Sequence, residues 1–359
     1  MKHRIAGFDL ARAYAIFGMY IVNFNIVFGN YKDSSVAGQL LSLFSGNSST
    51  LFVVLAGLGA SLMSKSKQAA PAHEKIQLQT VVGRRGWFLF FLGLALYSWW
   101  PADILHFYGT YMHIAALLLF VRKQVYIYVS LAAVTIFHVL LMIIPYESGW
   151  DFQTLQYKDF WTISGFLRNT FYNGWNPVFP WLAYFGVGMY LGRLDWTVAS
   201  TRYRIFGVGF ALFAAVLAVQ MLAKNQAIDA ELMIFLTADY LPPFLPFIVG
   251  TLGFALMAIS VFAWLGQFIK RSKLLECLAK TGQMTLTHYL SHLTIGMLML
   301  AYLGDRTYAP QPTDQPALSP IFILGFSAGY FIVSCCFSWL WLSKYRYGPL
   351  ETLMRKIAG

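Results

Sequence analysis

The chain has 359 residues, of which 58% are hydrophobic and only 11% are charged. A soluble domain carries roughly 25% charged residues, so this composition excludes a water-soluble globular protein and leaves lipid to cover most of the surface. The net charge of +11 would favour a nucleic-acid partner in a soluble protein. Here the basic residues stand in short segments between apolar runs, so we expect no nucleic acid as a partner.

Apolar runs taken in chain order predict an all-α fold, a polytopic bundle of about ten transmembrane helices. A full crossing takes about 20 residues, and the third and sixth runs are short for one. The expected spans are residues 8–29, 40–63, 86–99, 104–120, 125–144, 178–191, 205–222, 245–265, 284–303 and 321–342.

The basic residues predict that the N-terminus and the C-terminus are both cytoplasmic. If the spans alternate from an inner N-terminus, the inner segments with Arg12 hold 21 of the 26 Lys and Arg residues. Cytoplasmic loops of membrane proteins carry this excess, so the lipid bilayer is the first partner of the chain. The five basic residues left outside are Lys32, Lys158, Arg168, Lys224 and Arg306.

No composition change marks a domain boundary, so residues 1–359 are expected to form a single domain. The outer-surface segment at 151–175 is polar and aromatic. Its residues Phe160, Ile163, Leu167 and Phe171 fall at helical spacing. This pattern predicts an interfacial helix that lies on the outer surface of the membrane.

The first span carries three polar side chains that need a reason to lie in hydrocarbon. Asp9 and Arg12 are i,i+3 neighbours and can pair. Asn23 lies eleven residues past Arg12, which places it about 20° from the same helix face. The stripe indicates either a polar site or, equally, a structural ion pair with an Asn that joins two helices.

The fourth span places His106, Thr110 and His113 on one helix face, at positions i, i+4 and i+7. We expect His106 near the outer interface and His113 deeper in the membrane. A lone membrane His is usually a packing residue that is hydrogen-bonded. Stacked His residues on more than one helix favour a polar cavity.

The ninth span repeats this arrangement with Thr285, His288 and His292 on one face of its inner half. Two His residues at i and i+4 can bind zinc. No Cys or carboxylate stands at a fixed spacing to supply a third ligand, so no metal is expected here.

Four stretches of the chain resemble the YeiB-like bacterial membrane proteins, a family defined by a domain of unknown function (DUF418). They are residues 4–23, 103–108, 282–289 and 345–355, in the family's order. The resemblance implies a multi-pass protein of the bacterial inner membrane. It also implies that the matching polar residues line a cavity or bind substrate, namely Asp9, Arg12, Asp103, Tyr108, Thr285, His288, Glu351 and Arg355. We expect His292 beside them because it shares a helix face with Thr285 and His288.

The spacing of Asp9, Arg12 and Asn23 also resembles the first helix of the transmembrane acyltransferase superfamily. Residues 176–182 followed by Gly192 and Arg193 resemble its heparan-glucosaminide acetyltransferase branch. This resemblance implies an acyl-CoA co-substrate, acetyl-CoA above all, and an acceptor that is a glycan or a lipid. That branch has its catalytic His in the loop after the first helix, whereas this chain has no His from residue 6 to residue 71.

The leading interpretation is therefore a membrane-embedded acyltransferase whose base is another His. His106 or His113 would act as the base, and Asn23 would hydrogen-bond the thioester carbonyl. The CoA phosphates would meet basic residues on the inner face, namely Arg84, Arg85, Lys270, Arg271 and Lys273.

Two other classes of function stay open, a transporter or lipid flippase and a non-catalytic scaffold or sensor. No acidic residue lies in the middle of an expected span, which weighs against ion-coupled transport. A homo-oligomer is also left open. The terminal motif predicts that a basic neighbour, Arg346 or Arg355, holds Glu351 at the inner surface.

Overall fold

The structure is a computed structural model that describes residues 5–30, 33–224, 229–309 and 315–359. Lys32 and Arg4, the first residue of the stretch 4–23, lie outside these described residues. Helices dominate, because a chain in lipid can satisfy its backbone hydrogen bonds only within helices or closed barrels. The all-α fold class is confirmed for the described part of the chain, which holds one two-stranded hairpin besides its helices.

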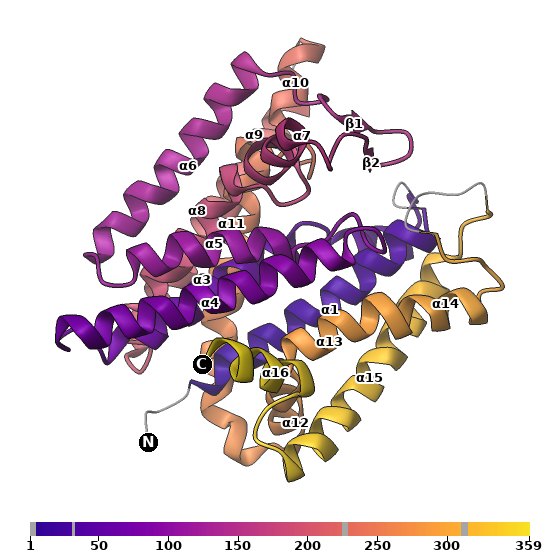
Figure 1. The fold of residues 1–359 in the computed structure, drawn as a ribbon. Coiled ribbons are helices and arrows are strands. Elements are labelled where there is room, and N and C mark those ends of the chain that lie inside the picture. Colours follow the sequence, from indigo (N-terminus) through magenta and orange to yellow (C-terminus); the bar gives the residue numbers. More distant parts are fainter. Residues whose placement is uncertain (1–4, 31–32, 225–228, 310–314) are drawn as a thin grey trace. The chain divides into compact units, whose positions relative to one another are not determined.

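The elements follow one another along the chain as Figure 1 labels them. The first half comprises α1 (Ala6–Phe28), α2 (Val36–Ser42), α3 (Asn47–Lys65), α4 (Ala72–Leu96), α5 (Leu105–Leu118), α6 (Lys123–Ile143), β1 (Trp150–Asp151), β2 (Gln156–Tyr157), α7 (Ile163–Arg168), the π-helix η1 (Asn169–Asn173) and α8 (Val178–Gly192). The second half comprises α9 (Ala199–Lys224), α10 (Ala230–Leu236), α11 (Leu245–Leu265), the 3-10 helix η2 (Gly266–Arg271), α12 (Lys273–Gly282), α13 (Thr285–Ser291), the π-helix η3 (His292–Gly296), α14 (Met297–Leu303), α15 (Pro320–Lys344) and α16 (Pro349–Ala358).

The chain divides into two compact units. Unit 1 comprises Met1–Phe52, Trp196–Leu222 and Val249–Leu353. Unit 2 comprises Val53–Asp195, Ala223–Ile248 and Met354–Gly359. Each unit has its own core, with α1, α13 and α15 in the first and α4, α5 and α8 in the second.

Within the described residues, six helical segments are long and apolar enough to cross a membrane. They are Ala6–Phe28, Val36–Lys65, Lys123–Ile143, Ala199–Lys224, Leu245–Arg271 and Pro320–Lys344. The chain is thus a multi-pass membrane protein, while the expected number of ten crossings stays a prediction. The start of α15 is determined by its local sequence. Ser319 accepts a hydrogen bond from the amide of Phe322, and Pro320 occupies the first helical position.

Two of the expected spans are interrupted rather than continuous. In the second span, α2 and α3 are separated by a turn in which Gly46 has a φ of 71°. Glycine adopts this left-handed conformation without steric cost. In the ninth span, α13 passes through η3 into α14, and η3 begins at His292. A π-turn of this kind often marks a functional position.

The expected cytoplasmic location of Lys67 and Lys356 can be tested by cysteine labelling. A single cysteine at Lys67 or Lys356, in a variant without native cysteines, is expected to resist an impermeant thiol reagent in intact cells. Permeabilised cells should label both, because the basic-residue count places both positions inside. A cysteine at Lys158, whose side chain is 65% exposed, is the matched outer control and should label in intact cells. Labelling of Lys67 or Lys356 from outside would overturn the orientation.

The segment 151–175, which the sequence predicts on the outer surface, belongs to a hairpin followed by a short helix and is less helical than expected. β1 pairs antiparallel with β2, and α7 begins only at Ile163 because Thr162 caps it by accepting from the amide of Gly165. Phe160 precedes the helix and is buried, whereas Ile163 is 84% exposed, so they do not share one helix face. We call residues 146–174 the cap.

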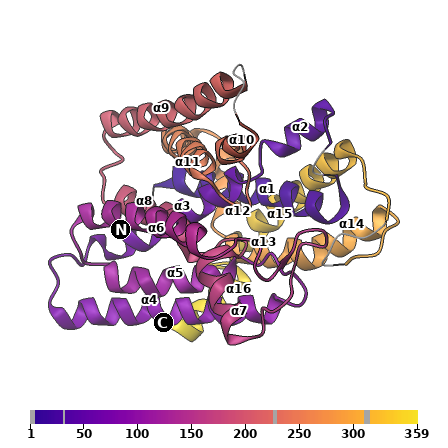
Figure 2. The same cartoon turned by 90° about the horizontal axis from the view of Figure 1, so that it is seen from above.

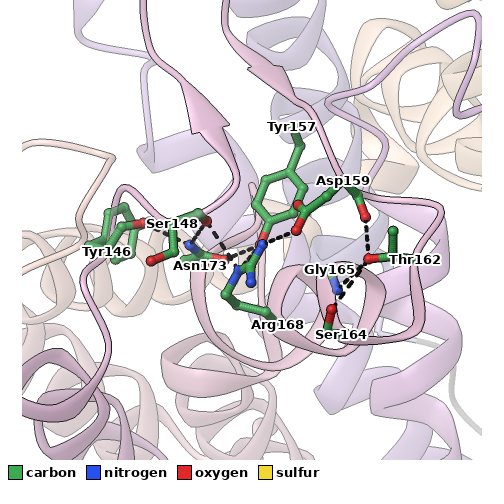
Figure 3. Close-up of polar contacts among 9 residues, drawn as sticks. All are labelled: Tyr146, Ser148, Tyr157, Asp159, Thr162, Ser164, Gly165, Arg168 and Asn173. Carbon is green, nitrogen blue, oxygen red and sulfur yellow. Dashed lines mark hydrogen bonds and ion pairs between the residues drawn. The ribbon is translucent and has the colours of Figure 1, made fainter.

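Arg168, which is partly buried, and Asn173, which is fully buried, hold the cap together through polar contacts (Figure 3). Arg168 Nη2 lies 2.5 Å from Asp159 Oδ2, and its Nε donates to the Tyr157 hydroxyl at 2.8 Å. The Tyr157 hydroxyl donates in turn to Asn173 Oδ1 at 2.7 Å. Burial raises the pKa of Tyr157 to about 12, so this hydroxyl stays protonated and remains a donor at physiological pH. The cap is therefore a folded element in its own right.

Candidate functional site

The N-terminal end of α5 carries a buried carboxylate–imidazole pair. Asp103 Oδ2 accepts a hydrogen bond from the backbone amide of His106 at 3.0 Å and from its Nδ1 at 3.2 Å. Both side chains are fully buried. The same carboxylate thus satisfies an amide at the start of the helix and orients the imidazole.

This pairing leaves the other ring nitrogen of His106 available. A carboxylate is an acceptor, so Nδ1 carries the proton and Nε2 presents a lone pair. Nε2 is buried and has no hydrogen-bond partner among the described residues. An imidazole held by a carboxylate with Nε2 available is the arrangement that general bases use in acyl transfer.

A close approach of α4 makes the pair possible. A Cβ on Gly93 of α4 would lie 2.4 Å from Asp103 Oδ2 and 2.3 Å from the His106 amide nitrogen, so only glycine fits there. Both views show α4 and α5 running side by side (Figures 1 and 2). The close approach of α4 thus encloses the carboxylate and the imidazole between the two helices.

Aromatic rings surround His106. Its ring centroid lies 3.8 Å from that of Phe107, 5.8 Å from that of Phe160 and 6.2 Å from that of Tyr97. Phe160 stacks on Tyr97 at 3.5 Å, so the cap contacts the end of α4 that lies next to His106. Tyr108, which follows Phe107 on α5, is also buried. The imidazole therefore lies in an apolar, aromatic environment.

His113 lies two turns further along α5. Its Nδ1 donates to the carbonyl of Gly109 at 2.7 Å, and its ring centroid lies 4.5 Å from that of Trp87. Its Nε2 is buried without a partner among the described residues. Thr110 stands between the two His residues and donates to the carbonyl of His106. The face that the sequence predicts thus carries two imidazoles that present Nε2.

Asn23 of the first unit is engaged elsewhere. Its Nδ2 donates to Nε2 of His292 at 2.9 Å, and Nδ1 of His292 donates to the carbonyl of His288 at 3.2 Å. Both nitrogens of His292 are therefore occupied, so it is a poorer base than His106. The expected cavity shared by Asn23 and His106 stays a prediction.

Ser338 and Ser334 of α15 are polar partners that the sequence analysis missed. Nε2 of His288 donates to the Ser338 hydroxyl at 2.6 Å, and that hydroxyl donates to the carbonyl of Ser334. The hydroxyls of Tyr20 and Ser334 lie 3.1 Å apart. The signal was present, because Tyr330, Ser334 and Ser338 repeat at i, i+4 and i+8 within an apolar span.

The Asp9–Arg12 pair that the sequence predicts is confirmed. Arg12 Nη1 lies 2.8 Å from Asp9 Oδ1, and Asp9 is buried in the first turn of α1. Arg12 is partly exposed, so the pair joins a buried carboxylate to a cation at the helix end. The contact supports the structural interpretation of these two residues at least as well as the functional one.

The partner that we expected for Glu351 is wrong. Its carboxylate accepts from the amides of Leu286 and Thr287 at 2.7 and 3.1 Å and from the Thr287 hydroxyl at 2.6 Å, where Arg346 or Arg355 was predicted. The physical reason is the start of α13, whose first amides have no partner inside the helix and carry partial positive charge. Arg355 lies in the last turn of α16.

Glu351→Gln is expected to destabilise the protein by about 1–3 kcal/mol. Glutamine keeps one acceptor oxygen and replaces the other with an NH2 donor, which then faces either the α13 amides or the Thr287 hydroxyl. Thermal unfolding of the purified protein in detergent measures the change. Glu74→Gln is the matched control, since Glu74 forms an exposed pair with Lys67 at 3.3 Å. Equal melting temperatures for the two variants would contradict a role for Glu351 in holding α13.

Two known families match overlapping parts of the chain. Residues 4–219, more than half of the chain, match the family described as "Heparan-alpha-glucosaminide N-acetyltransferase, catalytic". Residues 191–359 match the family described as "Protein of unknown function (DUF418)". No curated protein matches the chain. Both resemblances that the sequence carries are confirmed by these matches.

Proposed function

The chain belongs to the family of the heparan-alpha-glucosaminide N-acetyltransferase catalytic domain, and from this premise we propose that it is a membrane-embedded acyltransferase that uses acetyl-CoA. The observation that carries the proposal is the buried Asp103–His106 pair, whose imidazole Nε2 has no partner in the described part of the chain. The acceptor is an amine or hydroxyl at or beyond the outer face of a bacterial inner membrane.

His106 is the base in this proposal. Its Nε2 takes the proton of the acceptor amine or hydroxyl as the acceptor's nitrogen or oxygen forms a bond to the acetyl carbonyl carbon. The C–S bond of the thioester then breaks, and the CoA sulfur leaves with a proton. Asp103 stabilises the imidazolium that forms between these steps and holds the ring in the productive tautomer.

In this proposal His106 also replaces the catalytic His that the acetyltransferase branch has in the loop after its first helix and that this chain lacks there. The described loop after the first helix has Ser34 and no His, so a base must come from another element. Of the candidate His residues, His106 is the one with both a carboxylate partner and a buried, unpartnered Nε2 among the described residues. Nε2 of His113 is also buried without a partner among these residues, but its Nδ1 donates to a backbone carbonyl and not to a carboxylate.

The remaining roles stay as the sequence suggests. Asn23 hydrogen-bonds the thioester carbonyl, which requires it to exchange its bond to His292 for the substrate. The CoA phosphates bind the basic inner face, because phosphate pairs with Arg and Lys. The residues proposed there are Arg84, Arg85, Lys270, Arg271 and Lys273.

Acetyl transfer by the purified chain in proteoliposomes tests the proposal. Radiolabelled acetyl-CoA is supplied with glucosamine, the acceptor that the family's description suggests, and both labelled product and free CoA thiol are measured. We expect product and thiol to appear in equal amounts. If no amine or alcohol acceptor is acetylated while the vesicles take up or flip a solute, the transporter interpretation replaces this one.

A further inference from the structure

Three cations lie together where η2 ends and α12 begins. Lys270 and Arg271 are the last residues of η2, and Lys273 is the first residue of α12. All three side chains are exposed, and they form no ion pair among the described residues. The nearest acidic residue in the sequence is Glu276, and it pairs with Lys280 at 3.1 Å. The three positive charges are therefore left for a partner outside the described part of the chain.

Exposed apolar side chains stand on both sides of these cations. Trp264, near the end of α11, is 49% exposed, and Leu274 of α12 is 68% exposed. The segment Leu245–Arg271 is long and apolar enough to cross a membrane, so its basic end lies where the bilayer meets water. Trp is typical of this level of the membrane. We call residues 264–274 the corner.

The surface of the corner continues that of a membrane-spanning helix. Val261 lies one turn before Trp264 on α11 and is also exposed. The bilayer that covers Val261 therefore reaches Trp264 and, beyond it, the cations. Since the basic residues of the sequence place this end of α11 on the cytoplasmic side, the lipid in question belongs to the inner leaflet.

The combination of charge and apolar surface matches an anionic phospholipid. Lys and Arg pair with phosphate oxygens, while Trp264 and Leu274 offer apolar contacts to the glycerol backbone and the acyl chains. A cluster of Lys and Arg beside a spanning helix is attracted to anionic lipid, and each cation strengthens binding about fivefold.

The phosphates of CoA are the other source of the same chemistry. A soluble nucleotide would leave Trp264 and Leu274 exposed, whereas a phospholipid covers them. The corner also belongs to the first unit, whereas Arg84 and Arg85 belong with His106 to the second. Both observations favour the lipid.

We infer that the corner binds an anionic phospholipid of the inner leaflet through Lys270, Arg271 and Lys273. This partner goes beyond the proposed function, and it narrows the proposed CoA-phosphate site to Arg84 and Arg85. The lipid holds the start of α12 at the membrane surface. At the other end of α12, Gly282 packs so closely on the Asp9 carbonyl of α1 that only glycine fits.

Quenching of Trp264 fluorescence by brominated lipid tests the corner without any acetyl transfer. The purified full-length chain is reconstituted in phosphatidylcholine vesicles that contain increasing fractions of dibrominated phosphatidylglycerol. Matched vesicles contain dibrominated phosphatidylcholine instead. Bromine quenches a Trp that it contacts, and the share of Trp264 is the difference between each chain and the same chain with Trp264→Phe. We expect phosphatidylglycerol to quench Trp264 at a lower fraction than phosphatidylcholine does.

Substitutions in the corner should remove this preference for the anionic lipid. Arg271→Gln is expected to lower it about fivefold, and Arg271→Gln with Lys273→Gln about 25-fold. Arg122→Gln with Lys123→Gln is the matched control, because it removes two exposed charges at the start of α6 in the second unit. This control should leave the preference at Trp264 unchanged.

Salt provides a second measurement, should the double variant of the corner fail to fold. About 1 M NaCl should abolish the preference in the wild type, because it screens exposed charges. Equal quenching by the two brominated lipids would overturn the inference. Displacement of brominated phosphatidylglycerol by millimolar acetyl-CoA would also overturn it and assign the corner to CoA. A lipid preference in a chain that transfers no acetyl group would keep the corner and remove the proposed function.

Discussion

His106→Gln is expected to lower the rate of acetyl transfer to glucosamine by about 10²–10⁴-fold, the usual contribution of a general base. Glutamine approximates the size of the imidazole and can keep a contact to Asp103, but it cannot take a proton near neutral pH. The measurement is the initial rate of labelled product formation in proteoliposomes that contain equal amounts of folded protein. The KM for acetyl-CoA is expected to change little, because the lost group acts on the acceptor.

His138→Gln is the matched control for this prediction. His138 lies on α6, and its Nδ1 donates to the carbonyl of Val134 at 2.8 Å, which is a packing role. The rate of acetyl transfer by the His138→Gln variant is expected to stay within about twofold of the wild-type rate. A His106→Gln rate within threefold of the wild type would remove His106 as the base. Imidazole added to His106→Gly should restore part of the rate if the ring acts by proton transfer.

Asn173→Leu is expected to destabilise the second unit by about 2–4 kcal/mol, because the change leaves buried groups without partners. Asn173 is fully buried, and its Nδ2 donates to the carbonyls of Tyr146 and Ser148 at 2.7 and 2.8 Å (Figure 3). Its Oδ1 accepts from the Tyr157 hydroxyl. Leucine has a similar volume and offers none of these bonds. Thermal unfolding in detergent measures the loss, and limited proteolysis locates it in the cap.

Ser164→Ala tests whether any change in the cap has this effect. The Ser164 hydroxyl is exposed and lies 3.4 Å from that of Thr162, so its removal is expected to change stability by less than about 0.5 kcal/mol. If Asn173→Leu shifts the melting temperature no more than Ser164→Ala does, the polar network does not hold the cap. Because Phe160 of the cap packs on Tyr97 beside His106, a loosened cap should also lower acetyl transfer.

The membrane class, the helical content and the polar stripes of single helices could be predicted from the sequence. Apolar runs determine helices in lipid because the backbone has no other donors and acceptors there, and α11 (Leu245–Leu265) has the bounds that its run predicts. Helical periodicity likewise placed His106 and His113 on one face. Within one helix, spacing alone determines which residues are neighbours, so the Asp9–Arg12 pair was also predictable.

Contacts between elements were decided only by the tertiary structure. Asn23 binds His292, which is 269 residues away, and Glu351 binds the first amides of α13 instead of a basic neighbour. Phe160 is buried and lies before α7, although its spacing predicted that it shares one face of an interfacial helix with Ile163. A periodic pattern reports which face of one helix is polar. It carries no record of the rotation and register at which helices pack, because these depend on side-chain shape along the whole contact.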